Sequence, residues 1–534
     1  MKAKRLKLEF TSFLTSVKLT DRKALVACLS LGFFVRLIPE LLAFPLPIGF
    51  DTIHYAVAMK SGVILPNWSA FFTSTWLLYA LIVPLYSLLQ VDPFLLLKVV
   101  APLLFGLNVA GVYWFARKML SWNLRMSLLT GVFFALQLAS LRISWDLLRN
   151  TLGLGILLFA LSYLKEIGSR RGFALFTLLS LLTVFAHEYA AVTLLVVVVG
   201  LVVWRLVKSQ VDSGSIRLAF AVLPALTVFL TGIWLRIFPV HYALETNIVI
   251  AGDAVSARQG SLFFMVDYLR VQTSVDYYAS YWSLALSVGF LFAVLYLPYL
   301  FLIAKGFFKN RVLNVWTMLL LIGAFGCLVV PFFALEYWHR WMFMLVYPFT
   351  FFAVNGFSKL LRKSSLEGKT HAFSWFSNKK AAGTVLLTFS LGIAYLATPV
   401  LMVYASVSVP SITATYLYFS TSPTVPYEDV NSVVQAMSWL NGNMTAVSCV
   451  VLQNAFLSWG QLYLGKSHVI VHFENDVNSA VNTAFGHGFS SVFFVWWNEP
   501  NGWYGISVPQ SFVRVQDFGR ISVYVYEGGN VGGS

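Results

Sequence analysis

Asp51 is the acidic residue whose position most strongly suggests chemistry. It follows the first long apolar run of the chain, within the stretch Pro-Leu-Pro-Ile-Gly-Phe-Asp of residues 45–51, and His54 and Tyr55 lie within one helical turn of it. A carboxylate at the edge of a bilayer costs free energy, so it is usually kept for an ion, a proton or a substrate. The spacing therefore predicts a functional carboxylate, with a solvated acid in an interfacial turn as the alternative.

Two further polar pairs interrupt apolar runs. His187 and Glu188 are adjacent at the tip of a tight hairpin, where almost no other polar residue is near. A His-Glu pair alone does not make a zinc site, which needs three or four ligands, so a substrate contact is the functional interpretation. Asp146 and Arg149 are three residues apart, close enough on one helix to pair with each other. Structural pairing is the alternative to a role in binding.

The densest polar cluster at a turn between apolar runs contains Glu336, His339 and Arg340. Arg340 is flanked by Trp338 and Trp341, which suits an interfacial anchor. A guanidinium held between aromatic rings also suits the binding of a phosphate group. Both interpretations remain open at this point.

The elements that position these residues are those of a membrane protein. Of the 534 residues, 58% are hydrophobic and only 11% are charged, and the mean hydropathy is +0.76. Runs of roughly 20 apolar residues, the length that spans a bilayer, recur across residues 24–405. We expect a polytopic α-helical protein with about eleven transmembrane helices, ten to thirteen being allowed because apolar runs do not fix the geometry of crossing.

The net charge of +15 comes from Lys and Arg in short connections between apolar runs. This pattern marks the cytoplasmic side of a membrane rather than a nucleic-acid-binding face. We expect a cytoplasmic basic N-terminus at residues 1–23, a long first outer loop at residues 46–93 and a second outer loop at residues 239–280. An apolar run at about residues 71–89 would then lie on or dip into the outer leaflet, in a multi-pass protein of the cell membrane.

Residues 406–534 have the composition of a water-soluble domain. Helical and strand patterns alternate from residue 429 to residue 497, which predicts a small α/β sheet with parallel strands. Two strand-like runs at residues 512–516 and 521–526 predict a closing hairpin. The last apolar run would carry this domain to the extracytoplasmic side.

These motifs together resemble the GT-C-fold integral-membrane glycosyltransferases that use polyprenyl phosphate sugars. The resemblance is to archaeal members, in the superfamily of dolichyl-phosphate-mannose mannosyltransferases and oligosaccharyltransferases. It rests on the Gly49-Phe-Asp51 loop, the stretch from Trp145 to Asn150, the His187-Glu188 tip, the turn with Arg340 and the α/β tail. Each motif is short, but together they cover nearly the whole chain.

The resemblance implies that Asp51 is the general base that activates an acceptor while a sugar leaves its lipid phosphate. Arg340 and His339 would contact the phosphate, with Arg149 as a further candidate, and Glu188 would hold the sugar or the acceptor. The remaining residues implied to bind substrate are His54, Tyr55, Asp146, His187 and Glu336. The partners would be a polyprenyl (dolichyl) phosphate donor, a glycan, lipid or protein acceptor, and the lipid bilayer. A divalent cation, Mg or Mn, is a candidate cofactor.

Three alternatives remain. Oligosaccharyltransferases of this fold carry a Trp-Trp-Asp-Tyr-Gly motif, whereas this chain has Trp496-Trp497-Asn498, without the Asp. A lipid or solute transporter would place acids midway along helices and repeat its hydropathy between halves, and neither feature is visible. A receptor-like scaffold would not need an acid in the first loop.

Overall fold

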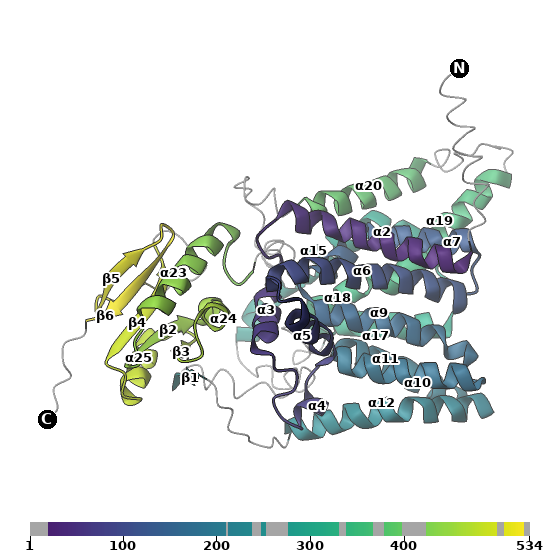
Figure 1. Cartoon of the computed structure of the whole chain (residues 1–534). Coiled ribbons are helices and arrows are strands. Elements are labelled where there is room, and N and C mark those ends of the chain that lie inside the picture. The colour runs from purple at the N-terminus through teal and green to yellow at the C-terminus, as the bar shows by residue number, and fades with distance from the viewer. Residues whose placement is uncertain are drawn as a thin grey trace.

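The computed structural model describes residues 20–209, 212–237, 247–252, 276–329, 338–366, 379–397, 423–498 and 507–527. Long helices run side by side in a bundle, and a smaller domain of strands and helices lies beyond one end of it (Figure 1). This arrangement confirms the polytopic helical fold with a C-terminal α/β domain. Glu336 and most of the expected loop 239–280 lie outside the described residues.

Seven helical stretches in the described part of the chain are long and apolar enough to cross a membrane. They are α2 (Asp21–Leu42), α6 (Pro93–Lys118), α11 (Glu188–Val207), α12 (Ser213–Ile237), Leu284–Gly306 (from α15, Asp276–Tyr296, into α16, Leu300–Gly306), Arg311–Leu328 (α17, Arg311–Phe325, and the turn after it) and Trp338–Leu360 (α18, Trp338–Met344, and the start of α19, Val346–Leu366). The bent pair α7 (Leu124–Ala135) and α8 (Leu138–Asp146) makes an eighth if it counts as one span.

Three shorter helices belong to the same bundle: α9 (Leu148–Ser162), α10 (Arg170–Ala186) and α20 (Lys379–Leu396). The expected eleven crossings require all three to cross in addition to the eight, so that number stays a prediction. Large apolar side chains on the outer helices are exposed, as lipid contact requires. On α12 they include Phe220, Leu230 and Trp234.

The centre of the bundle is held by close packing and by a polar contact. A Cβ on Gly106 of α6 would lie 2.5 Å from the carbonyl oxygen of Leu29 in α2, so the two helices approach as closely as small residues allow. The Asn108 side chain donates to the carbonyl of Thr151 at 2.7 Å and accepts from the Tyr347 hydroxyl at 2.7 Å. One side chain of α6 thus connects α9 and α19.

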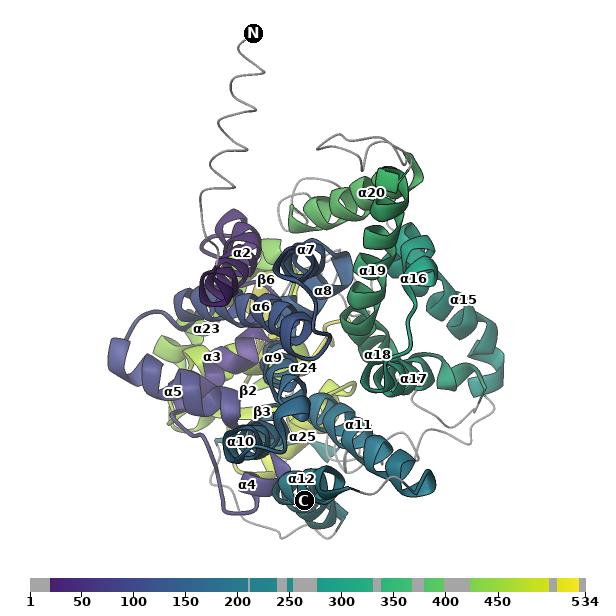
Figure 2. The same cartoon turned by 90° about the vertical axis from the view of Figure 1, so that its right-hand side faces the viewer.

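Three short helices follow α2 and lie across the end of the bundle that faces the C-terminal domain. They are α3 (Thr52–Ser61), α4 (Ala70–Thr73) and α5 (Leu77–Leu89). In Figure 2 the bundle is seen along its length, and α3 and α5 run roughly in the plane of the picture. With 13 residues, α5 is shorter than a membrane span. The segment after α2 therefore lies across this end of the bundle.

The C-terminal domain contains a mixed six-stranded sheet in the order β1-β3-β2-β4-β6-β5. Strands β1, β3, β2 and β4 are parallel, and the β5–β6 hairpin joins β4 antiparallel. The elements are β1 (Ile248–Ile250), α23 (Val430–Asn443), β2 (Ser448–Gln453), α24 (Asn454–Tyr463), β3 (Val469–Phe473), α25 (Val477–Gly486), β4 (Ser491–Trp497), β5 (Phe512–Asp517) and β6 (Ile521–Tyr526). The predicted parallel strands and closing hairpin are confirmed.

Strand β1 was not predicted. It comes from the segment between α12 and α15, almost 200 positions before β2, and pairs with β3 from Ile248 opposite Ile470. Three apolar residues are too short to signal a strand on their own. The pairing places the segment after α12 on the same side of the membrane as the C-terminal domain, because a strand cannot pair through the bilayer.

Candidate active site

The Asp51 loop is pressed against the end of α8 at Gly49. This glycine has φ of 92°, in the left-handed region that side chains disfavour. A Cβ at this position would lie 2.6 Å from the carbonyl oxygen of Trp145 and 3.0 Å from the Cβ of Asp146. Only glycine allows this approach. The loop and the end of α8 therefore carry Asp51 and Asp146 as one packed unit.

Asp51 lies at the residue before α3 and is half-buried. Its backbone carbonyl accepts from the amides of His54 and Tyr55, but its carboxylate does not cap the helix. Within the described ranges, that carboxylate forms neither a hydrogen bond nor an ion pair. A carboxylate with free lone pairs is available to accept a proton from a bound group.

Tyr55 joins the Asp51 helix to the end of α8. Its side chain is buried, and its hydroxyl donates to the carbonyl oxygen of Asp146 at 3.3 Å. Burial raises the pKa of Tyr55 above its ordinary value, and the negative charge of Asp51 adds to the rise. The phenol therefore stays neutral and remains a donor.

Asp146 pairs with Arg142, not with Arg149. The Arg142 guanidinium lies 2.6 Å from the Asp146 carboxylate, one helical turn earlier on α8, and both side chains are buried. The expected pairing of Asp146 with Arg149 is wrong because α8 ends at Asp146 and Leu147 breaks the helix before α9 begins. Three residues apart in sequence, the two side chains belong to different helices.

Arg149 is a largely buried cation among neutral groups. Its Nη1 donates to the Thr75 hydroxyl at 3.0 Å, and its guanidinium lies 5.8 Å from the centre of the Tyr79 ring. Its Nε has no hydrogen-bond partner, and across the described part of the chain it forms no ion pair with a carboxylate. Tyr55 and Asp51 are within its electrostatic reach. A buried guanidinium without a carboxylate is a receptor for an anion.

His187 and Glu188 have structural partners. The predicted hairpin is confirmed, since His187 alone separates α10 from α11. The His187 ring caps α11 by accepting from the Tyr189 amide at 3.2 Å, and it stacks on the Tyr189 ring. Glu188 forms an ion pair with Arg236 of α12 at 2.5 Å, and Arg236 also donates to the carbonyl of Thr73. Their roles in substrate binding stay predictions.

Arg340 is placed at the same end of the bundle. Its guanidinium lies 6.0 Å from the centre of the Tyr189 ring. Asp146 is within electrostatic reach of both Asp51 and Arg340, and His187 is within reach of both Arg149 and Arg340. The acid of the first loop and the late arginine, far apart in sequence, thus lie around the same buried carboxylate.

The two histidines predicted to bind substrate, His339 and His54, contact different parts of the protein. The His339 ring contacts Trp338 and Phe343 within α18. His54, on α3, shares a hydrogen bond of 2.7 Å with the Ser458 hydroxyl of α24 in the C-terminal domain. His54 therefore connects the first loop to the C-terminal domain.

The described residues contain no group of three or more His, Cys, Asp or Glu side chains that would hold a metal ion. Among the described residues, Asp51 and Asp146 are the carboxylates around the end of α8, and Asp146 is bound to Arg142. Mg and Mn favour several oxygen ligands, so these two carboxylates alone do not make such a site.

Sequence reasoning missed a buried charged cluster behind the Asp51 loop. Arg36, Glu40 and Lys98 come from α2 and α6 and are all nearly inaccessible. The signal was present, because ionisable residues inside apolar spans are rare and usually functional. The topology rule was applied to Lys and Arg in the connections between apolar runs, and Arg36, Glu40 and Lys98 were not singled out.

No protein-family model matches the chain, and no curated protein matches it by sequence. Solved structures do match. Arabinofuranosyltransferase AftD from Mycobacteria has a TM-score of 0.50 at 14% identity, covering 96% of this chain and 40% of its own. ArnT from Cupriavidus metallidurans has a TM-score of 0.48 at 12% identity, over 94% and 97% of the two chains. The Archaeoglobus fulgidus oligosaccharyltransferase has a TM-score of 0.47 at 12% identity, over 87% and 69%.

At these identities the likeness concerns the fold alone. The alignment with AftD runs over nearly all of this chain, bundle and C-terminal domain together, while this chain spans two fifths of AftD. The fold is therefore similar to that of AftD over nearly the whole of this chain. The chemistry must be argued from the side chains of this chain.

Proposed function

We propose that this protein is an integral-membrane glycosyltransferase that moves a sugar from a polyprenyl phosphate to an acceptor. The reaction takes place at the end of the bundle that carries Asp51 and faces the C-terminal domain. The GT-C-like fold supports the class of enzyme, and the side chains around Asp146 support the chemistry. Asp51 is the general base of the proposed reaction.

The observation that carries the proposal is the pairing state of four charged side chains in one place. Asp146 is neutralised by Arg142, whereas the Asp51 carboxylate and the Arg149 guanidinium have no charged partner among the described residues. A displacement at a sugar phosphate needs these two free groups, one to take a proton and one to hold the phosphate. Asp146 with Arg142 supplies the fixed framework between them.

The proposed step is a single displacement. The acceptor oxygen attacks the anomeric carbon, its proton passes to the Asp51 carboxylate, and the bond from the anomeric carbon to the phosphate oxygen breaks. The electron pair of that bond goes to the lipid phosphate, whose growing charge Arg149 stabilises from a buried position. Arg340 is a second cation for the same phosphate. One displacement inverts the configuration of the sugar.

The acceptor side is assigned to the extracytoplasmic face. The basic connections between apolar runs support a cytoplasmic N-terminus, and the His54–Ser458 contact joins the Asp51 helix to the C-terminal domain. The donor is a polyprenyl phosphate of the dolichyl type, and the acceptor is a glycan, a lipid or a protein. A divalent cation is not part of this proposal.

The structure gives the oligosaccharyltransferase alternative little support. Trp496 and Trp497, the aromatic part of the motif, are buried in the C-terminal core. The Trp497 indole donates to the carboxylate of Asp429 at 2.7 Å, so it is used inside the domain. Asn498, which stands where the motif has Asp, bonds to Asp517 and Gly519 of the neighbouring hairpin.

The test is transfer by the purified protein in proteoliposomes that contain a panel of polyprenyl phosphate sugars and candidate acceptors. Wild type is expected to form product with one donor class. Asp51→Asn should lower the rate by about a hundredfold to ten-thousandfold, the range that a general base contributes, while the melting temperature stays that of wild type. Unchanged product formation by a folded Asp51→Asn variant would refute the role of Asp51.

A further inference from the structure

A buried cluster of three charges lies behind the Asp51 loop, in the helix bundle. Arg36 and Glu40 are one turn apart on α2, and Lys98 is on α6. Glu40 is the shared carboxylate: its oxygens lie 2.8 Å from the Arg36 guanidinium and 3.4 Å from Lys98 Nζ. Its three members are each at most 6% exposed. Burying three charges is expensive, so the contacts they make elsewhere are informative.

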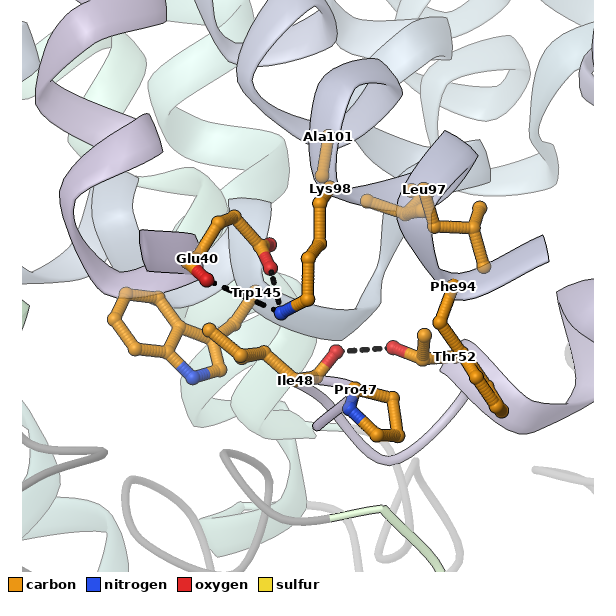
Figure 3. Close-up of a pocket in the computed structure, with 10 residues that line it drawn as sticks. Glu40, Pro47, Ile48, Thr52, Phe94, Leu97, Lys98, Ala101 and Trp145 are labelled. Carbon is orange, nitrogen blue, oxygen red and sulfur yellow. Dashed lines mark hydrogen bonds and ion pairs between the residues drawn. The ribbon is translucent and has the colours of Figure 1, made fainter. Parts of the chain in front are cut away.

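Lys98 binds the beginning of the Asp51 loop. Its Nζ donates to the carbonyl oxygen of Glu40 at 3.1 Å and to that of Leu46 at 2.6 Å. Glu40 lies in the last turn of α2, where carbonyls have no partner within the helix. In Figure 3 the Lys98 amine points at Glu40, while Ile48 of the loop and Thr52 at the start of α3 line the other side of a small pocket. One amine thus holds both the end of α2 and the chain that leaves it.

Arg36 binds the end of α8. Its Nε donates to the Ser144 hydroxyl at 3.1 Å and its carbonyl at 3.3 Å, and its Nη2 donates to the carbonyl of Trp145 at 3.3 Å. The guanidinium also lies 4.8 Å from the centre of the Trp145 ring. These are the final carbonyls before Asp146, and Gly49 packs against the same Trp145 carbonyl. Arg36 therefore fixes the surface on which the loop rests.

We propose that Arg36, Glu40 and Lys98 are positioning residues for the reaction: through shared Glu40 they hold the Asp51 loop at a fixed place relative to the end of α8. None of the three needs to touch substrate. The two cations grip the two segments that carry Asp51 and Asp146, and the carboxylate holds the cations together. This inference rests on the proposed function for its kinetic consequence, but its structural consequence is independent of it.

The alternative is that the cluster merely holds α2 to α6. The chain offers a matched control, because Arg117 and Asp21 join the same two helices at their opposite end, with Arg117 Nε 3.0 Å from the Asp21 carboxylate. Lys98→Gln removes the hydrogen bond to the Leu46 carbonyl. Arg117→Gln removes an ion pair between α2 and α6 that contacts neither the Asp51 loop nor the end of α8. Comparing these two variants distinguishes an effect on the position of the Asp51 loop from an effect on the stability of the bundle.

Hydrogen–deuterium exchange of the full-length protein in nanodiscs is the first readout. Lys98→Gln is expected to speed exchange in residues 43–52 at least tenfold and to leave the far ends of α2 and α6 unchanged. Arg117→Gln should leave residues 43–52 as in wild type. Equal exchange of this segment in wild type and a folded Lys98→Gln variant would overturn the proposal, whatever the protein catalyses.

The second readout is kinetic. Lys98→Gln should lower kcat about tenfold or more, because a small displacement of the reacting groups is costly, while KM for the donor stays within threefold. Arg117→Gln should keep kcat within twofold. Equal loss of kcat in both variants at equal melting temperature would show a structural role only and overturn positioning. If exchange changes as expected but wild type transfers no sugar, the proposed function fails and the structural inference stands.

If Lys98→Gln does not fold, Glu40→Gln takes its place. It keeps the shape of the side chain and the Lys98 bonds to the Glu40 and Leu46 carbonyls, but it removes the charge that joins Lys98 to Arg36. Exchange should then rise at residues 43–52 by a smaller factor than expected for Lys98→Gln, about threefold. No change in exchange in this variant would overturn the role of Glu40 as the shared link.

Discussion

Two groups of acids and arginines, one at the bundle end and one in the C-terminal domain, use the same residue types in opposite ways. In the C-terminal domain, Asp429 is fully buried and accepts from Trp497 and from Arg520, and Arg520 also pairs with Glu428 at 2.8 Å. Burial raises the pKa of Asp429, and the two donors work against the rise. Each charged side chain of this cluster therefore has a partner within the domain.

At the bundle end the pairing is incomplete. Asp146 is satisfied by Arg142, but Arg149 is a largely buried cation that has no carboxylate partner among the described residues and contacts Thr75 and aromatic rings. Residue type and burial alone therefore do not separate a structural cluster from a functional one. In a structural cluster each charge has a partner of opposite charge within the protein. In a functional cluster one charge gains such a partner only when the substrate binds.

The largest loss of stability is expected from a substitution at Asp429, in the fully paired cluster of the C-terminal domain. Asp429→Ala leaves the Trp497 indole without its acceptor and leaves Arg520 paired with Glu428 alone. The loss of one neutral and one charged hydrogen bond should destabilise the C-terminal domain by about 2–4 kcal/mol. Thermal unfolding of the full-length protein measures this. At temperatures where the domain remains folded, the rate of transfer should stay within twofold of wild type. A large loss of transfer in folded protein would mean that this cluster too takes part in the reaction.

A smaller effect, on the rate of transfer, is expected from a substitution at Gly49, at the bundle end. Gly49→Ala forces a Cβ against the Trp145 carbonyl in a left-handed conformation, so the loop must move away from α8. We expect kcat to fall about ten- to hundredfold, because misplacement by about 1 Å can cost that much. Donor binding should change little.

Gly62→Ala is the control, because Gly62 ends α3 with a positive φ but a Cβ there would meet no atom within 4 Å. Equal kinetic loss in both variants would contradict the role of the Gly49 contact.

Much of the fold was predictable from sequence, for physical reasons. In the C-terminal domain the predicted strand at residues 512–516 matches β5 to within one residue, and the one at residues 521–526 matches β6. Alternating apolar patterns there are bounded by polar turns, which makes ends visible. Strand β1 was missed because three residues carry no period. It also lies far from its partner β3 in sequence.

The candidate site was predictable in location but not in pairing. The turns that carry Asp51, Asp146, His187 and Arg340 were expected at one end of the bundle, and the structure places them there. Which arginine meets which acid depends on the break at Leu147, which no spacing rule shows. On sequence alone, Arg149 ranks below Arg340 as the residue that binds the phosphate. In the structure Arg149 is the clearer candidate, because it has no carboxylate partner among the described residues. Glu336 lies outside the described residues, so its role stays a prediction.

The most direct test of the account is the affinity of the purified protein for a polyprenyl phosphate, measured by native mass spectrometry for wild type and three variants. Arg149→Gln should weaken binding about ten- to hundredfold, since a hydrogen bond to a charged group contributes about 1.5–3 kcal/mol. Asp51→Asn should bind as wild type does, and Arg236→Gln, at the same bundle end but paired with Glu188, should stay within threefold. Wild-type affinity in a folded Arg149→Gln variant would contradict the claim that this unpaired arginine holds the phosphate.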